Sequence, residues 1–236
     1  MLQSPRFTLP DSTRDYALLT WTSAMDCFSW SLPAGKKGAC PMEDTTPNSI
    51  CLSCYAQQGR YLFPVVQSCQ QARFQYLKSN PIACLNDISS FIHRHRLPYF
   101  RVHDSGDFHT RHMIGLWLNI CNANPTTKFW FPTRAHTFPQ WVPALQALNS
   151  LPNVTVRPSA IHFGDEPPVV RHLAAGTVSM KQELPGIYQC PKAKTHTSCG
   201  TEECRYCWDN PLEYINYLPH GHVVPRSVAL TIGATA

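Results

Sequence analysis

The sequence predicts an α/β fold, a partial parallel (βα) barrel with cysteine-rich loop regions at both chain ends. In the middle of the chain, short apolar strands alternate with amphipathic helices. Polar side chains follow each predicted strand, and most of the eleven cysteines lie in two groups outside this alternating region. Because strand–helix–strand alternation is typical of parallel sheets, we expect parallel βα units with the cysteine-bearing loops packed over the carboxyl edge of the strands.

The composition indicates one domain with a core of its own. The chain has 236 residues, 43% of them apolar, so its cysteines are not needed as staples for a small scaffold. We expect a single domain over residues 1–236. It divides into a cysteine-rich N-terminal loop region (1–60), a βα core (61–185) and a cysteine-rich C-terminal region (186–236).

Neither a membrane span nor a secretory signal is visible. The chain has no apolar run of spanning length, and residues 1–15 lack a basic flank followed by an apolar stretch. We therefore expect a cytoplasmic protein without a membrane partner. Thiols stay reduced in that compartment, so Cys-x2-Cys spacings favour metal sites over disulfides. A net charge of +5 without a block of Lys or Arg permits a nucleic-acid partner but does not require one.

Outside the alternating region, regular elements are few. Residues 1–60 are expected to be mainly loop, because prolines and glycines interrupt any regular element there. Apolar positions at helical spacing predict helices over 62–78 and 84–95. Residues 189–209 are again expected to be loop, with a short helix after Pro211.

The alternating region consists of strands over 99–103, 128–132 and 153–157, separated by helices over 112–121 and 138–148. The polar residues at the three strand ends are His103, Asp104, Ser105 and Asp107, then Thr133, Arg134 and His136, then Arg157 and Ser159. Ligands of parallel α/β folds bind at the carboxyl ends of the strands, so these segments are expected to line one pocket.

The first cysteine group is Cys40, Cys51 and Cys54, a C-x10-C-x2-C arrangement. Two thiolates with two residues between them can hold one metal centre from a single turn, and a third thiolate from a preceding loop can close one face. Three ligands leave one coordination position open, as in catalytic zinc or in an iron–sulfur cluster with one non-cysteine position.

The second group is Cys190, Cys199, Cys204 and Cys207, spaced C-x8-C-x4-C-x2-C. Four thiolates this close in sequence predict a closed site for zinc or an iron–sulfur cluster. Alternatively Cys51 or Cys54 completes a site made mainly of these later cysteines. His220 and His222 either replace a cysteine as zinc ligands or form a surface pair. The remaining cysteines are expected to be buried small hydrophobes, namely Cys27, Cys69, Cys84 and Cys121.

Residues 103–108 contain two carboxylates, Asp104 and Asp107. One can act as a general acid or base while the other orients it, or both can bind a ligand's amine and hydroxyl groups. Alternatively one of them caps the following helix. Arg134 and Arg157 are candidates to bind a carboxylate or phosphate, or to form buried salt bridges with the same aspartates.

The order of these motifs resembles the phage family called gene product 88. The likeness runs over roughly residues 36–222 and rests on Cys40-Pro41, Cys51-x2-Cys54-Tyr55-Ala56, the 103–108 string, Trp117, Cys190-Pro191, Cys199, Cys204 and Cys207-Trp208. This resemblance implies a phage or prophage origin, and therefore the cytoplasm of an infected or lysogenic host cell. It implies little about chemistry.

The string Cys51-x2-Cys54-Tyr55-Ala56 is also similar to the end of the cysteine motif of radical S-adenosylmethionine enzymes such as spore photoproduct lyase. Residues 104–107 stand where those enzymes have an acidic glycine motif that contacts the methionine amine. The similarity implies that Cys40, Cys51 and Cys54 hold a [4Fe-4S] cluster that binds S-adenosylmethionine, with an auxiliary cluster on the later cysteines. That superfamily places three residues between its first two cysteines, whereas ten lie between them here.

Residues 104–108 are similar, too, to the Asp-Ser-Gly-Gly-Phe segment of guanine transglycosylases, which carry zinc near the C-terminus. Phage relatives of those enzymes insert 7-deazaguanines into DNA. This similarity implies that Asp104 is a general acid/base and that Cys199, Cys204 and Cys207 bind zinc with Cys190 or a histidine. Asp165 is the best-placed nucleophile, and the chain is short for that barrel.

We expect an iron–sulfur enzyme of the radical S-adenosylmethionine type, with one or two [4Fe-4S] clusters and S-adenosylmethionine as a candidate cofactor. Its substrate would be a small molecule, a nucleotide or a nucleic-acid-related compound; DNA is a permitted partner and no obligate protein partner is indicated. The alternatives are a zinc-dependent transglycosylase that modifies phage DNA and a noncatalytic metal-stabilised binding protein. The expected catalytic residues are Asp104 and Asp107, and the expected ligand-binding residues are His103, Ser105, Gly106, Arg134 and Arg157.

Overall fold

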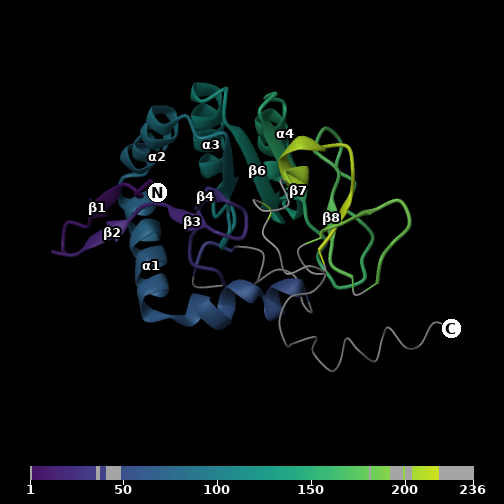
Figure 1. Cartoon of the computed structure of the whole chain (residues 1–236), viewed down its shortest axis with the longest axis horizontal. Coiled ribbons are helices and arrows are strands. Elements are labelled where there is room, and N and C mark those ends of the chain that lie inside the picture. Colours follow the sequence, from purple (N-terminus) through teal and green to yellow (C-terminus); the bar gives the residue numbers. More distant parts are fainter. Residues whose placement is uncertain are drawn as a thin grey trace.

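The computed structural model describes residues 2–35, 38–40, 49–180, 182–191, 199 and 204–217. Within these residues an open sheet of five strands forms the middle of the molecule (Figure 1). In spatial order its strands are β3 (Thr20–Thr22), β4 (Cys27–Trp30), β5 (Tyr99–Val102), β6 (Lys128–Thr133) and β7 (Val154–Pro158). Strands β4 to β7 run parallel, and the edge strand β3 is antiparallel to β4. The predicted run of three parallel strands is confirmed.

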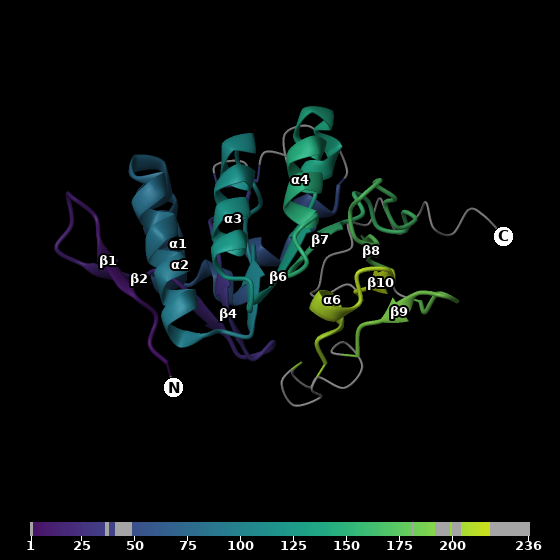
Figure 2. The same cartoon turned by 90° about the horizontal axis from the view of Figure 1, so that it is seen from above.

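One face of this sheet is covered by a row of helices, which Figure 2 shows from above. They are α1 (Pro64–Ser79), α2 (Pro81–His95), α3 (Arg111–Ala123) and α4 (Val142–Asn149). Asn80 and Thr110 cap α2 and α3, because their side chains accept the backbone N–H groups of Ala83 (3.2 Å) and Met113 (3.3 Å). Helix α2 begins at Pro81 rather than after it, since proline suits the first helical position.

The helix predicted over 138–148 is shorter in the structure. Two 3-10 helices, η5 (Ala135–Thr137) and η6 (Pro139–Trp141), precede α4, and η6 occupies the start of that range.

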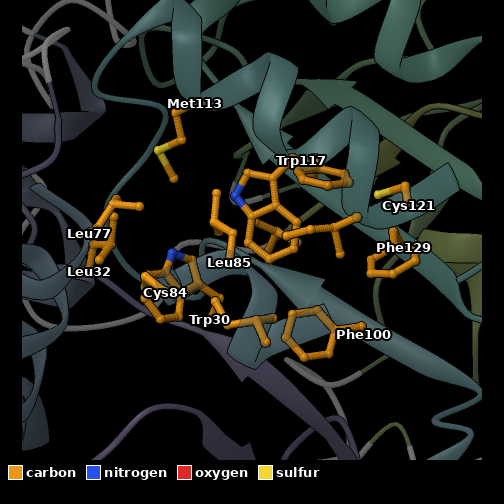
Figure 3. Close-up of a cluster of buried hydrophobic side chains, with 14 of the residues drawn as sticks. Trp30, Leu32, Leu77, Cys84, Leu85, Phe100, Met113, Trp117, Cys121 and Phe129 are labelled. Carbon is orange, nitrogen blue, oxygen red and sulfur yellow. The ribbon is translucent and has the colours of Figure 1, made fainter. Parts of the chain in front are cut away.

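Alternate strand residues face the helices and form the main core (Figure 3). Phe100 of β5 and Phe129 and Phe131 of β6 are fully buried. The ring of Trp117, on α3, lies edge-on to Phe131 with 5.6 Å between their centroids. Burial of each such ring stabilises the fold by about 2 kcal/mol, so this layer fixes the position of the strand ends.

The other strand residues face a second layer made by the C-terminal part of the chain. The short helix α6 (Tyr206–Asp209) packs there through Trp208, whose ring lies 5.1 Å from that of Trp130 on β6. The Trp208 indole N–H donates to the carbonyl of Phe100 (3.0 Å), and the Thr155 hydroxyl donates to the carbonyl of Trp208 (2.8 Å). The short helix thus precedes Pro211, and the prediction that it follows this proline is wrong.

A second, smaller sheet of three parallel strands is formed by residues that follow β7 in the chain. Its strands are β8 (Thr177–Val178), β10 (Ile215–Asn216) and β9 (Tyr188–Gln189), in that spatial order. A parallel bridge between Ser159 and Thr177 links it to the segment after β7. The expected mixed α/β fold with a largely parallel sheet is confirmed, but no closed barrel forms among the described residues.

The N-terminal region contains more regular structure than predicted. It holds a hairpin of β1 (Arg6–Thr8) and β2 (Asp15–Ala17), the strands β3 and β4, and three 3-10 helices, η2 (Ile50–Ser53), η3 (Tyr55–Gln57) and η4 (Gly59–Leu62). The prediction of loop over 1–60 is therefore wrong for these segments. The buried pair Phe28 and Trp30 has the period of two that is typical of a strand. None of the helices in the described part of the chain has the length and apolarity needed to span a membrane.

Candidate functional site at the carboxyl edge of the sheet

Hydrogen bonds hold the loop after β5 against the loop after β4. The Leu32 N–H donates to the carbonyl of Ser105 (3.0 Å), and the Ser105 hydroxyl donates back to the carbonyl of Leu32 (2.7 Å). Farther along, the Asp107 N–H donates to the carbonyl of Ala39 (3.1 Å). Gly106 lies between the loops with φ of 78°, and a Cβ there would stand 2.9 Å from that of Leu32. Glycine is therefore required where the loops approach each other.

These hydrogen bonds between the loops bring Cys40 close to residues 103–108, which contain Asp104 and Asp107. Burial raises the pKa of the Cys40 thiol well above its ordinary value, and the nearby Asp107 carboxylate and the sulfurs of Cys54 and Cys51 add to the rise. Cys51 and Cys54 stand in one turn, closed by the Cys54 N–H on the carbonyl of Cys51 (3.2 Å). The first cysteine group therefore gathers beside the residues that follow β5.

The same turn is tied to the segment after β7, because the Ile50 N–H donates to the carbonyl of Ile161 (2.8 Å). The segments that follow β4, β5 and β7 thus meet at one edge of the sheet. Residues 41–48, which connect Cys40 to this turn, lie outside the described residues.

The cysteines are thiols rather than disulfides. Among the described residues, no three His, Cys, Asp or Glu side chains converge closely enough to hold a metal ion as they stand. The donor set nevertheless suits a thiophilic metal. Cys40 comes from one loop, and Cys51 and Cys54 come from a turn of the chain near it. Thiols bind such a metal as thiolates, after the metal has displaced their protons.

Asp104 is held by two side chains from distant parts of the sequence. One carboxylate oxygen accepts a charged hydrogen bond from Arg101 (2.5 Å), and the other accepts the hydroxyl of Tyr61 (2.7 Å). The hydroxyl of Tyr55 donates to the backbone carbonyl of Asp104 (2.5 Å) and accepts from Arg101 (3.2 Å). Burial lowers the pKa of Arg101, but Tyr55 and Asp104 more than offset this, so the guanidinium stays charged.

Sequence patterns do not indicate a role for Arg101, Tyr61 or the Tyr55 hydroxyl. The one signal in the sequence is the charged residue Arg101 in the middle of an apolar strand. Sequence spacing does not connect Tyr61 to Asp104, because only the packing of η4 brings them together.

Asp107 joins the ends of two strands. One of its oxygens accepts the N–H of Phe108 (2.7 Å) and the hydroxyl of Thr133 (2.6 Å), and the other accepts the N–H of Arg134 (2.8 Å). Burial raises the pKa of this carboxyl group, although the three donors favour its charged form. Asp107 does not cap α3, since Thr110 fills that position.

His103 follows β5 in a left-handed conformation, with φ of 67°. Its ring is buried edge-on against Phe108, with 4.7 Å between centroids, and neither ring nitrogen has a hydrogen-bond partner in the described structure. Burial, with smaller effects from His109 and Arg101, lowers the pKa of His103 to about 3. The imidazole is therefore neutral near pH 7.

The two predicted anion-binding arginines differ in environment. The Nε of Arg134 donates to the carbonyl of Ala160 (2.9 Å), and its terminal nitrogens make no hydrogen bond to the described part of the chain. Arg157 is fully buried and donates all five of its N–H groups to backbone carbonyls, those of Cys207, Ala175, Glu213, Tyr206 and Asn210. Among the described residues, neither arginine forms the alternative salt bridge with Asp104 or Asp107.

The second cysteine group lies over the sheet face opposite the helices rather than at the carboxyl edge. The Cys199 N–H donates to the carbonyl of Ala24 (2.7 Å), in the turn that leads into β4, and the Cys204 N–H donates to the carbonyl of Cys199 (2.8 Å). The Cys190 N–H donates to the carbonyl of Asn216 (3.0 Å) on β10. The expectation that both groups pack over the carboxyl edge is not met by this group.

The Cys207 thiol lies 3.1 Å from the hydroxyl of Tyr217. Burial raises the pKa of Cys207 to about 12, with Cys190 and Cys199 among the neighbours that add to the rise. The sulfurs therefore share one neighbourhood. His220 and His222, the alternative ligands, lie outside the described residues.

The remaining cysteines follow the prediction in part. Cys84 and Cys121 are buried among apolar side chains, whereas Cys69 is only partly buried. Cys27 is buried as well, but it stands beside the second group, since Cys199 is among the charges that act on its thiol.

The Asp104–Tyr61 pair forms part of the wall of a cavity of about 490 Å³. The segment around β3 and the helix α1 supply most of the remaining wall. Asp165, the nucleophile implied by the transglycosylase similarity, accepts hydrogen bonds from the backbone (2.8 Å) and ring (3.1 Å) of His162 and does not line this cavity.

Comparison with known proteins gives one family. The sequence model of a family described as gene product 88 matches residues 8–210, a range that contains both cysteine groups and the whole five-stranded sheet. No curated protein and no solved structure gives a significant match.

Proposed function

The chain belongs to the gene product 88 family, and we propose that it is an iron–sulfur enzyme of the radical S-adenosylmethionine type. The observation that carries the proposal is the set of hydrogen bonds between the loop after β4 and the loop after β5. Cys40 comes from the loop after β4, the string of residues 104–107 follows the neighbouring parallel strand β5, and hydrogen bonds through Leu32 and Ala39 hold the two loops together. A three-thiolate centre would thus stand beside a carboxylate at the carboxyl edge of a parallel sheet.

In this proposal Cys40, Cys51 and Cys54 hold a [4Fe-4S] cluster. When bound, such a cluster supplies electron transfer and one iron that is open to a small ligand. A hydrogen bond joins the start of the Cys51–Cys54 turn to the segment after β7. This supports a position for Cys51 and Cys54 at the same carboxyl edge as Cys40.

Asp104 would receive the amine of S-adenosylmethionine. Arg101 and Tyr61 each donate a hydrogen bond to one of its oxygens, so the carboxylate is held in one orientation. Each oxygen retains a second lone pair with which it can accept an ammonium N–H group. Asp107, by contrast, would position Thr133 and Arg134 rather than contact the ligand, because its oxygens already accept three donors from its own chain.

The second cysteine group would hold an auxiliary metal centre, with zinc and an iron–sulfur cluster as the two candidates. Its distance from the carboxyl edge suggests a role in fixing the C-terminal layer rather than in binding the substrate. We favour the iron–sulfur enzyme over a zinc transglycosylase because Asp165, the nucleophile that the transglycosylase similarity implies, does not line the cavity beside Asp104.

Binding of S-adenosylmethionine to anaerobically purified full-length protein tests this proposal. Equilibrium dialysis should show about one molecule bound per chain, and Asp104→Asn should weaken binding at least about tenfold, since a charge-assisted hydrogen bond is lost. Asp87→Asn is the matched control, because Asp87 lies on α2 and does not line the cavity beside Asp104, and this variant should bind as the wild type does. Absence of binding to iron-loaded wild-type protein would refute the assignment.

A further inference from the structure

The cavity beside Asp104 is built from polar and aromatic side chains. It lies between α1 and the segment that contains β3, and its volume of about 490 Å³ is in the range of small-molecule sites. Trp21, on the edge strand β3, lines it and is 37% exposed. A ring surface that is open to a cavity can stack on a planar ligand.

Two buried polar side chains in its wall have no hydrogen-bond partner among the described residues. The hydroxyl of Ser31 is one, in a residue that is 2% exposed. Gln70, on α1, is 5% exposed and lines both this cavity and the neighbouring one, and its amide makes no hydrogen bond in the described part of the chain. Because a buried polar group without a partner costs free energy, the Ser31 hydroxyl points to a ligand that carries hydrogen-bonding atoms, and the Gln70 amide is available to the same ligand.

The charges of the wall indicate an anionic ligand. Arg73 is 4% exposed and donates to the carbonyls of Ala17 (2.8 Å), Ser31 (3.3 Å) and Leu19 (3.2 Å). It forms no ion pair among the described residues, although the Asp104 carboxylate is near enough to act on its charge. Arg60 also lines the cavity and forms no ion pair there. The single carboxylate of the wall, Asp104, is already paired with Arg101. The described wall therefore carries an excess of positive charge.

We propose that this cavity binds a mononucleotide, with its base between Trp21 and the Gln70 amide and its phosphate at Arg60 and Arg73. The assignment names the substrate class of the proposed enzyme, and as a substrate site it rests on that proposed function. The cavity ends at Asp104, so the bound nucleotide would lie next to the first cysteine group. Gln70 can both donate to and accept from the edge of a base, which allows purines and pyrimidines alike.

The test is isothermal titration of the full-length protein with adenosine and guanosine 5′-monophosphates, with the matching nucleosides and with inorganic phosphate. We expect a monophosphate to bind at least about tenfold more tightly than its nucleoside, because the phosphate meets a guanidinium. Gln70→Leu should weaken binding by about fivefold or more, as expected for a lost hydrogen bond. Arg60→Gln should reduce the preference for the monophosphate, since Arg73 alone remains to bind the phosphate. Because Arg60 is exposed, this variant keeps the test independent of folding.

Gln67→Leu is the matched control, one turn earlier on α1, in the wall of a neighbouring cavity and not of this one. Its affinity should equal that of the wild type. The inference would be overturned if neither monophosphate bound. It would also be overturned if the wild type, Gln70→Leu and Arg60→Gln bound the monophosphates equally well. Binding of inorganic phosphate alone with the same affinity as the nucleotides would overturn it too.

Iron analysis of the same samples separates this inference from the proposed function. Nucleotide binding to protein that holds no iron under anaerobic reconstitution would uphold the cavity assignment and remove the iron–sulfur proposal. Iron and S-adenosylmethionine binding without nucleotide binding would remove the cavity assignment alone.

Discussion

The Asp104 carboxylate lies 2.5 Å from the Arg101 guanidinium, three residues earlier in the chain, and the two side chains are only 12% and 10% exposed. Arg101 also lies 4.9 Å from the centre of the Trp130 ring, which links the carboxyl edge to the sheet face that carries the second cysteine group. The Arg101–Asp104 ion pair therefore connects the carboxyl edge, where the proposed cluster would bind, to the sheet face that carries the second cysteine group.

Removal of Arg101 should leave a buried carboxylate without its charge partner. We predict that Arg101→Met lowers the free energy of unfolding at pH 7 by about 3 kcal/mol or more, the cost of a broken buried pair. Urea unfolding measures it. The double variant Arg101→Met/Asp104→Asn should recover part of the loss. A loss in the double variant equal to the sum of the losses in Arg101→Met and Asp104→Asn would show that the pair is not coupled.

The close approach of the two loops predicts that Gly106→Ala is damaging. The methyl group would meet Leu32 at 2.9 Å in a backbone conformation that disfavours side chains, so we expect a loss of at least about 2 kcal/mol and less metal bound per chain. Gly186→Ala is the control, because Gly186 has a similar φ of 73° but open space around its Cβ position. Similar losses in both variants would mean that loop contact adds nothing to the backbone cost.

Acid should destabilise the protein through His103. Its pKa is lowered to about 3 in the folded state, while the unfolded chain has the ordinary value near 6.5. The unfolded state therefore binds more protons in this window, and stability falls as the pH falls from about 6.5 toward about 3, by up to a few kcal/mol. His136, whose pKa is lowered to about 4, adds to the same trend. Chemical unfolding of His103→Phe over this range should show a smaller slope than the wild type, and an unchanged slope would contradict the assignment.

Arg157 should matter for stability more than for ligand binding. Lysine retains the charge but can donate at most three hydrogen bonds, so Arg157→Lys leaves buried carbonyls unsatisfied and should cost about 2 kcal/mol or more. Arg134→Lys, with a single bond from its side chain to Ala160, should cost less than about 1 kcal/mol. Thermal unfolding compares the two variants, and the reverse order would contradict the contacts described for them.

The periodic elements could be predicted from the sequence because their signal is local. The apolar positions of α1 and α3, and the apolar runs of β5 to β7, identify each element without reference to its neighbours. The sequence pattern does not predict strand β4, because Phe28 and Trp30 are only two alternating apolar positions before Pro33. The strands β8, β9 and β10 have two residues each, so their pairing depends on distant partners that no short pattern contains.

The candidate site was predictable as a set of segments and not as a set of contacts. Residues 103–108 and Cys40 lie near the same strand ends, because carboxyl ends of parallel strands share an edge. The role of Arg157 cannot be inferred from the sequence, since its five acceptors are backbone carbonyls whose positions depend on the folded C-terminal layer. The sequence does not indicate Tyr61 or Gln70 for the same reason: the hydrogen bond of Tyr61 to Asp104 and the place of Gln70 in the cavity wall both arise from packing between elements.

Iron and sulfide analysis with a visible absorption spectrum, on wild-type protein and Cys54→Ser purified without oxygen, tests the central claim most directly. The account predicts a brown wild-type protein with about four irons per cluster and the broad visible band of thiolate-bound iron, and a Cys54→Ser variant that loses the iron of the first group. A colourless wild-type protein that holds zinc and no iron would contradict it.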